Sequence, residues 1–258
     1  MGPNRGKGAG DVNGFLNGVR WILDPLHWSG SNGIPTRVWE HLQLSIISLV
    51  LACLIAIPIA LWVGHTRRGQ VVTVQLANLG RSIPSLAILS VMFLIAVKAW
   101  PGLAFGFLPT IVALTLLGIP VILINTYVGI HEVDQETVEA ARGLGMSGRQ
   151  VLFRLEVPLA MPLIMTGLRL AAVQIVATAT LAALIAGGAL GRYIVDGYAQ
   201  QDTPMVVAGA ILVAALAILT DLTFSLLARI ATPRTSSANT RGARGSAPSP
   251  TSGRNTDG

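Results

Sequence analysis

Charged residues are scarce in this sequence. Only 12% of its 258 residues are Asp, Glu, Lys or Arg, whereas 52% are hydrophobic, and the mean hydropathy is +0.64. Soluble domains carry about 25% charged residues. The composition therefore excludes an ordinary soluble domain and indicates an integral membrane protein.

Cysteine, histidine and lysine are also scarce, and each scarcity excludes a kind of site. The single Cys53 leaves no intrachain disulfide and no multi-cysteine metal site. The four histidines never fall at HExxH spacing, so we expect no metal centre. Neither Lys7 nor Lys98 lies in a GxxxxGK[ST] phosphate-binding loop, so the chain is not expected to be its own ATPase. We expect no cofactor.

Apolar runs of membrane-spanning length make up most of the chain. A bilayer core about 30 Å thick needs about 20 apolar residues in a helix, and such runs occur at residues 42–63, 71–97, 107–128, 159–186 and 205–228. A polar stretch at residues 80–85 interrupts the second run, and we interpret it as a break within one span. The pattern predicts an all-α integral membrane protein with five transmembrane helices, or six if residues 71–80 cross on their own.

Basic residues set the expected orientation. Arg67 and Arg68 follow the first run, and five arginines lie from Arg229 onward, whereas the loops at 98–106 and 187–204 carry one basic residue each. Cytoplasmic loops carry the excess of Lys and Arg, so we expect the carboxyl terminus inside and, with five spans, the amino terminus outside. Basic residues at positions 5, 7, 20 and 37 favour the opposite side. The distribution of basic residues that orients the chain in the membrane accounts for the net charge of +6. We therefore expect no nucleic acid as a partner.

The chain divides into three parts. Residues 1–40 comprise a polar tail at residues 1–13, which is expected to be disordered and lacks the apolar core of a signal peptide, then an amphipathic interfacial helix indicated by apolar residues at 15, 19, 22 and 26. A poorly ordered leader is the alternative. Residues 41–230 form the membrane domain. Residues 231–258, rich in Ser, Thr, Pro, Gly and Arg, cannot bury enough apolar surface to fold and are expected to be a disordered cytoplasmic tail.

A polar loop at residues 129–158 separates the third and fourth apolar runs. Helix formers follow Asp134, and Gly143 and Gly145 are expected to break that helix. Ser147 can cap a second short helix over residues 148–155, which Pro158 is expected to stop. The loop is predicted to be a helix–turn–helix that projects into the cytoplasm and docks on a partner, or else a solvated loop with incidental charges.

This loop resembles the EAA loop of the permease subunits of ABC importers. Glu139-Ala140-Ala141, three residues, Gly145, nine residues and Leu155-Glu156-Val157-Pro158 match the family pattern EAA, three residues, G, nine residues, I-x-L-P, with mild swaps at Leu155 and Val157. In that family the loop inserts into a cleft of a cytoplasmic ATPase subunit and transmits its closure. The resemblance implies a coupling role for Glu139, Ala140, Ala141, Gly143, Gly145, Leu155, Val157 and Pro158.

Further segments resemble permeases of the glycine betaine, carnitine and choline uptake group. They are residues 81–85 (RSIPS), 125–127 (NTY), 177–181 (ATATL) and 187–191 (GGALG). The resemblance implies the five-span permease fold, a second permease subunit, identical or homologous, a pair of ATPase subunits and an extracytoplasmic binding protein. It also implies the plasma membrane of a prokaryote and a quaternary ammonium osmoprotectant as substrate. The candidate residues for the translocation path are Arg81, Ser82, Pro84, Asn125, Arg169, Thr178 and Thr180.

Three alternatives remain open. A permease for D-methionine or another amino acid would have the same spans and loop. Residues 145–148 (GMSG) contain the GxSG tetrapeptide of intramembrane serine proteases, but that chemistry needs a histidine base on a later span, and no histidine follows His131. A transporter independent of an ATPase is the third alternative. Against it, ionisable residues at membrane depth are few, namely Arg81, Arg169 and Asp221, and form no evident proton relay.

Overall fold

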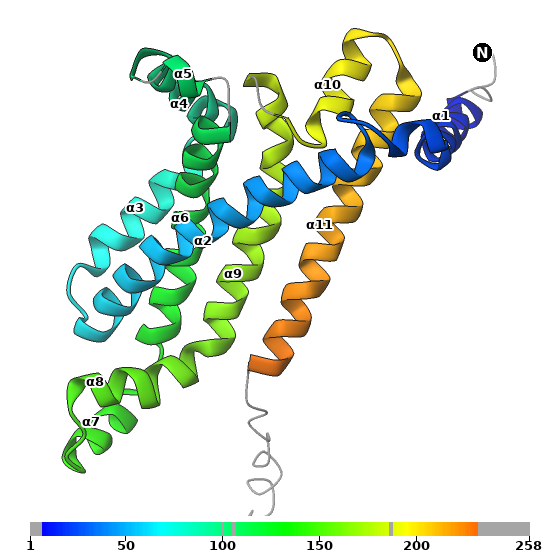
Figure 1. Ribbon diagram of the computed structural model, residues 1–258. Coiled ribbons are helices and arrows are strands. Elements are labelled where there is room, and N and C mark those ends of the chain that lie inside the picture. Colours follow the sequence, from blue (N-terminus) through cyan, green and yellow to red (C-terminus); the bar gives the residue numbers. More distant parts are fainter. Residues whose placement is uncertain (1–6, 100, 105–106, 186–187, 232–258) are drawn as a thin grey trace, which may run out of the picture.

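The computed structural model describes residues 7–99, 101–104, 107–185 and 188–231, which form the bundle of helices in Figure 1. Four helical runs in this part are long and apolar enough to cross a membrane: α2 (Ile34–Thr66), α6 (Phe107–His131), the run Gly148–Ile185 and α11 (Thr203–Ala231). The bent pair α3 (Gln70–Ser82) and α4 (Ser85–Ala99) makes a fifth if it counts as one span. The predicted all-α membrane fold is confirmed.

The shorter helices lie at the two ends of the bundle. They are α1 (Lys7–Leu23), η1 (Pro25–Trp28), α5 (Pro101–Ala104), α7 (Gln135–Gly143) and α10 (Gly191–Ala199). The run Gly148–Ile185 consists of α8 (Gly148–Val151), η2 (Leu152–Glu156), α9 (Val157–Ala179) and η3 (Thr180–Ile185). Figure 1 shows α1, α5 and α10 at one end and α7 and α8 at the other. Arg67 and Arg68 share a cavity with α7, so this basic end is the cytoplasmic one.

Small residues on α2 place α6 at the centre of the bundle. Every fourth residue of α2 over one stretch is small and buried: Ser48, Ala52, Ala56, Ala60 and Gly64. The three alanines of this stripe pack in one cluster with α6 side chains such as Val121 and Ile122. Small residues let helix backbones approach closely in a membrane, where the hydrophobic effect does not drive helices together. The stripe therefore fixes how α2 lies on α6.

Glycines make the second close contact, between α6 and α9. Gly118 of α6 meets Ile175, Gly129 of α6 meets Ala160, and Gly167 of α9 meets Asn125. A Cβ added at Gly167 would lie 2.6 Å from the Cβ of Asn125. Two helices thus pack closely on α6, which explains why it is the most buried of the spans.

Two helices begin earlier than the hydropathy predicts. α2 begins at Ile34 instead of residue 42, because Gly33 is extended before it and a proline occupies its first turn. Arg37 and Glu40 lie just before the apolar run. They form an ion pair of 2.8 Å on this added part of α2. α1 begins at Lys7, within a segment predicted to be disordered. The remainder of the predicted tails, residues 1–6 and 232–258, lies outside the described residues.

The amino-terminal helix packs on the outer end of the bundle. The Trp21 ring lies edge-on to Tyr193 of α10, with 5.2 Å between the ring centroids. A Cβ on Gly18 would collide with Val207 of α11. α1 is therefore held by α10 and α11 instead of being a free leader, and its place at the membrane interface stays a prediction.

The bent span has its break where the polar stretch predicts it. Ile83, which precedes Pro84, is extended, with φ −80° and ψ 127°, as residues before proline prefer. α3 therefore ends here, and α4 starts again at Ser85 at an angle of 89° to α3. The break brings residues 80–85 to the face of the bundle described below.

The Gly167 contact gives a first prediction. Gly167→Ala should lower the free energy of unfolding by about 1–3 kcal/mol, because the new methyl group overpacks the α6–α9 contact. The measurement is the thermal unfolding of the purified protein in detergent. Gly14→Ala is the matched control, since no atom lies within 4 Å of a Cβ at Gly14 and alanine favours helix by about 0.5–1 kcal/mol over glycine. Equal destabilisation of both variants would contradict the packing argument.

Candidate functional site

The polar loop between α6 and α9 forms a helical hairpin at the cytoplasmic end, which comprises α7, α8 and η2. The Asp134 carboxylate caps α7, accepting hydrogen bonds from the Thr137 backbone N–H at 3.0 Å and from the Thr137 hydroxyl at 2.7 Å. The bond from the Thr137 hydroxyl lowers the pKa of Asp134 below its ordinary value. The cap explains why the helix starts directly after Asp134.

The turn of the hairpin depends on one glycine. Gly145 has φ +87°, in the left-handed region that favours glycine. The N–H of Met146 donates to the carbonyl of Ala141 at 3.2 Å across this turn, as in a glycine-terminated helix end. Gly143 was predicted to break α7 as well. It is the last residue of the helix, but its φ is not in the left-handed region, so the turn itself depends on Gly145.

Ser147 starts the second arm of the hairpin as a helix cap. Its side chain accepts from the backbone N–H of Gln150 at 3.4 Å, and its own N–H donates to the Gln150 side chain at 2.8 Å. This is a reciprocal capping box. The serine of the GxSG tetrapeptide therefore has a structural role, as the cap of α8 in a cytoplasmic turn.

The hairpin has an apolar core of its own. Val133, Val138 and Val151 are buried together, and Ala141, Met146 and Leu155 pack against them. The opposite surface is exposed and includes Glu139, Ala140 and Leu144, the last with 87% of its surface accessible at the tip. Residues of the EAA pattern thus divide into an inward set, Ala141 and Leu155, which packs in the core of the hairpin, and an outward set, Glu139 and Ala140, which is exposed.

Pro158 does not end the second arm, which corrects the prediction from the sequence. The chain passes through a π-helical turn at Leu152–Glu156, where the N–H of Val157 donates to the carbonyl of Leu152. Pro158 then lies in the first turn of α9. A proline lacks an N–H and crowds the carbonyl four residues before it, and the wider turn relieves both problems. The second arm is therefore a continuous extension of the span.

A polar contact ties the hairpin to the end of α2. His65 Nδ1 lies 2.6 Å from an oxygen of Glu156, whose side chain is only 6% exposed. Beside this contact is a cavity of about 310 Å³ lined by His65, Thr66, Arg67, Arg68, Gln135, Val138, Arg142 and Glu156. Val157, the next residue of the EAA pattern, packs against Ile130 of α6 and Ile164 of α9. The hairpin thus contacts three spans at its base.

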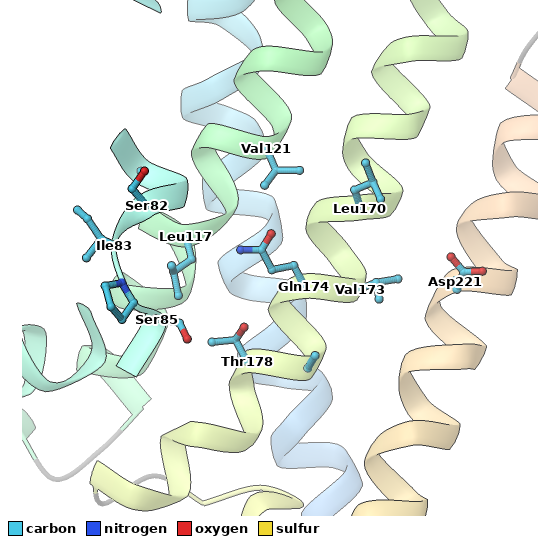
Figure 2. A pocket seen from close by; sticks show the side chains of 13 residues that line it. Ser82, Ile83, Ser85, Leu117, Val121, Leu170, Val173, Gln174, Thr178 and Asp221 are labelled. Atoms are coloured by element: carbon cyan, nitrogen blue, oxygen red, sulfur yellow. The ribbon is translucent and has the colours of Figure 1, made fainter. Parts of the chain in front are cut away.

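A second candidate site is a cavity of about 820 Å³ at membrane depth, which we call the polar cavity. It is lined by Gly80, Ser82, Ile83, Pro84, Ser85, Leu117, Val121, Leu170, Val173, Gln174, Ala177, Thr178 and Asp221. Figure 2 shows Gln174 and Thr178 of α9 pointing toward the α3–α4 break, with α2 behind α6 and α9. The cavity therefore opens on the face of the bundle away from α2.

An ion pair joins two helices at the edge of the polar cavity. Arg169 of α9 binds Asp221 of α11 through two hydrogen bonds, from Nε at 2.6 Å and from a terminal nitrogen at 2.7 Å. The two side chains are 42% and 38% exposed on the surface of the bundle. Such a bidentate pair fixes the relative orientation of the two side chains in addition to balancing their charges.

The structure brings some predicted path residues together and separates others. Ser82, Pro84 and Thr178 line the polar cavity, and Arg169 reaches it through Asp221. Asn125 instead donates to the carbonyl of Val121 at 2.7 Å beside Gly167, and Thr180 begins η3, outside the lining. The Arg81 side chain lies outside the described part of the chain.

Sequence reasoning missed Gln174, Ser85 and Asp221 as lining residues. A helical pattern could have found the first, because Leu170, Val173, Gln174, Ala177 and Thr178 share one face of α9 at spacings of three and four residues. Asp221 belongs to a helix far along the chain, and only the fold brings it to the cavity. Within the described ranges, no three His, Cys, Asp or Glu side chains gather to hold a metal ion.

A bundle of apolar spans with a cytoplasmic hairpin and a polar cavity is the architecture of a membrane transport component. The family described as "Binding-protein-dependent transport system inner membrane component" matches residues 49–237. The chain belongs to this family. It is therefore the permease component of a transport system and a multi-pass protein of a prokaryotic plasma membrane.

Within the family, the chain is similar to osmoprotectant permeases. It is 36% identical over 198 residues to the glycine betaine/carnitine/choline transport system permease protein OpuCB of Bacillus subtilis. This alignment covers 77% of this chain and 88% of the relative. It is 35% identical over 197 residues to the choline transport system permease protein OpuBB of the same organism, covering 76% and 88%. Both alignments leave out about a quarter of this chain.

The solved structure of the MetNI methionine ABC transporter, in an inward-facing conformation, has the same fold. Its matched chain superposes with a TM-score of 0.69 at 22% identity, covering 83% of this chain and 97% of that chain. At this level of identity the likeness shows the fold alone. It therefore does not favour an amino acid as the substrate.

The cap of α7 gives a second prediction. Asp134→Ala should speed amide hydrogen exchange at Thr137 and its neighbours, because the N–H group loses its acceptor, whereas Asp134→Asn should exchange like the natural protein. Exchange followed by mass spectrometry on the purified protein measures this. Equal exchange in the alanine and asparagine variants would contradict the capping role.

The pH dependence of this cap has a defined sign. Because the folded pKa of Asp134 is lowered from the ordinary 3.8, its stabilising contribution is fully present above that ordinary value and is lost as the pH falls through the lower folded value. Protection of α7 in the natural protein should therefore fall only in strong acid. The Asp134→Asn variant should lack that acid transition.

Proposed function

We propose that the chain is the permease subunit of an ATP-driven importer for quaternary ammonium osmoprotectants, such as glycine betaine, carnitine, choline and proline betaine-like compounds. The observation that carries the substrate class is the similarity to relatives named for these solutes, over most of the length of each. In this system, an extracytoplasmic binding protein delivers the solute and a separate subunit hydrolyses ATP. The permease itself performs no chemical reaction.

The outward surface of the hairpin is the proposed docking site for the ATPase, in a pair of copies per complex. Three features support this role: the exposed EAA residues Glu139 and Ala140, the exposed apolar tip at Leu144, and exposed basic residues on the same loop. Exposure of a large apolar side chain such as Leu144 to water is unfavourable, and burial in a pocket on a partner would remove that cost. The partner is cytoplasmic because the hairpin lies at the basic end of the bundle.

The continuity of the second arm supports transmission of motion. No loop separates α8 from α9, so a force on the hairpin acts directly on the span that lines the polar cavity. The contact between His65 and Glu156 passes the same motion to α2. An ATPase that contacts the hairpin differently in its open and closed states would therefore shift the equilibrium between conformations of the spans.

The face of the bundle on which the polar cavity opens is the proposed contact with a second permease subunit, identical or homologous. Charged side chains facing lipid at membrane depth are costly, yet Arg169 and Asp221 are about two-fifths exposed on this face. A second subunit across a water-filled path removes that exposure. The binding protein then docks at the opposite end from the hairpin, near α5 and α10.

An uptake experiment tests the proposed function. The complex with its ATPase and binding protein, reconstituted in liposomes with ATP on the cytoplasmic side, should accumulate radiolabelled glycine betaine, carnitine or choline, and should not accumulate methionine. The permease alone should accumulate none of them. Accumulation of methionine would support the amino-acid alternative, and accumulation without ATPase would refute an ATP-driven importer.

The hairpin tip gives a further prediction. Leu144→Asp should abolish binding of the ATPase, measured by co-purification from membranes, while the permease still inserts. Tyr198→Asp is the matched control, because Tyr198 is 82% exposed but lies on α10 at the opposite end of the bundle. If Leu144→Asp keeps its ATPase, the tip is not the docking site.

A further inference from the structure

We propose that the Arg169–Asp221 ion pair holds the wall of the translocation path electrically neutral, and thereby determines how the permease treats cationic and zwitterionic solutes. The inference rests on the proposed function, since it takes the polar cavity as part of the path. It assigns a specificity role to two residues that otherwise only join α9 to α11.

The position of the pair is the first support. Asp221 lines the polar cavity directly, and both of its oxygens are held by Arg169. Figure 2 shows Asp221 on α11, across α9 from the side where Gln174 and Thr178 point to the α3–α4 break. A carboxylate in this position would attract any cation in the cavity, and its bidentate contact with Arg169 cancels most of that attraction.

The composition of the remaining wall is the second support. Among the described residues that line the cavity, Asp221 is the sole ionisable one, and the other polar groups are the hydroxyls of Ser82, Ser85 and Thr178 and the amide of Gln174. None of these described lining residues is aromatic, so none of them offers a cation–π site for a quaternary ammonium group. Among the described lining residues and their partners, discrimination by charge therefore falls to the Arg169–Asp221 pair.

The solutes named in the relatives differ in the property that the pair controls. Choline carries a net positive charge, whereas glycine betaine and carnitine are zwitterions with no net charge at neutral pH. A neutral wall admits both kinds. A wall with an unpaired charge favours or disfavours choline alone, because a net charge interacts with a distant unit charge more strongly than a dipole does.

Two single variants remove one charge each and should act in opposite directions. Asp221→Asn leaves the Arg169 guanidinium unpaired and should lower the ratio of choline uptake to glycine betaine uptake. Arg169→Gln leaves the Asp221 carboxylate unpaired and should raise that ratio. We expect a change on the order of tenfold in each case, as for a unit charge about 10 Å from the solute at an effective dielectric constant of about 20.

The measurement uses the complete complex in liposomes, with permease, ATPase and binding protein. Each solute is supplied at a concentration that saturates the binding protein, so that the preference of that protein does not enter the ratio. The charge-reversed variant Arg169→Asp/Asp221→Arg keeps a neutral pair and should return the ratio to the natural value. Thr220→Val is the control next to Asp221, since Thr220 lines a different cavity and carries no charge.

A second set of variants leaves the pair intact in case a single variant fails to fold. Gln174→Lys and Gln174→Glu place a charge on the same wall, and they should lower and raise the ratio, respectively. Unchanged ratios in the folded charge variants would overturn the inference while the proposed function stands. A natural complex that transports neither choline nor glycine betaine would overturn the proposed function, and the inference would fall with it.

Discussion

A chain that crosses a bilayer must satisfy its backbone hydrogen bonds internally, and this constraint explains most of the structure. It makes each span a helix and confines irregular backbone to places with a special reason. The π-helical turn before Pro158 keeps the chain helical where a proline removes a donor. The one sharp break at membrane depth in the described part, at Ile83 and Pro84, lies beside the polar cavity, where freed backbone groups can meet polar partners instead of lipid.

Close packing turns these separate helices into one mechanical unit. The stripe of small residues from Ser48 to Gly64 holds α2 on α6, and glycines hold α9 on α6. The hairpin is attached to this unit by a continuous helix and by the contact of His65 with Glu156. A continuous helix and a buried polar contact therefore connect the hairpin to the helices that line the polar cavity.

The sequence alone predicted what depends on local rules, and it missed what depends on tertiary contacts. Hydropathy located the spans, and Asp134, Gly145 and Ser147 located the hairpin, because caps and left-handed turns are local. The start of α2 at Ile34 was missed because the charged residues Arg37 and Glu40, which lie before the apolar run, are nevertheless helical. The passage of the helix through Pro158 depends on a wider turn that no sequence rule specifies. The pairing of Arg169 with Asp221 joins positions 52 residues apart, which periodicity cannot reveal.

That pairing also bears on how the protein is made. Domains and spans emerge from the ribosome in order, amino-terminal parts first, so α9 enters the membrane before α11. α11 carries the Asp221 carboxylate in its carboxyl-terminal half, and the Arg169 counter-charge is on α9, which precedes α11 in the chain. An unpaired carboxylate at membrane depth is costly, so pairing with Arg169 favours the place of α11 beside α9. The contact that favours this arrangement of α9 and α11 is also the one at the edge of the cavity.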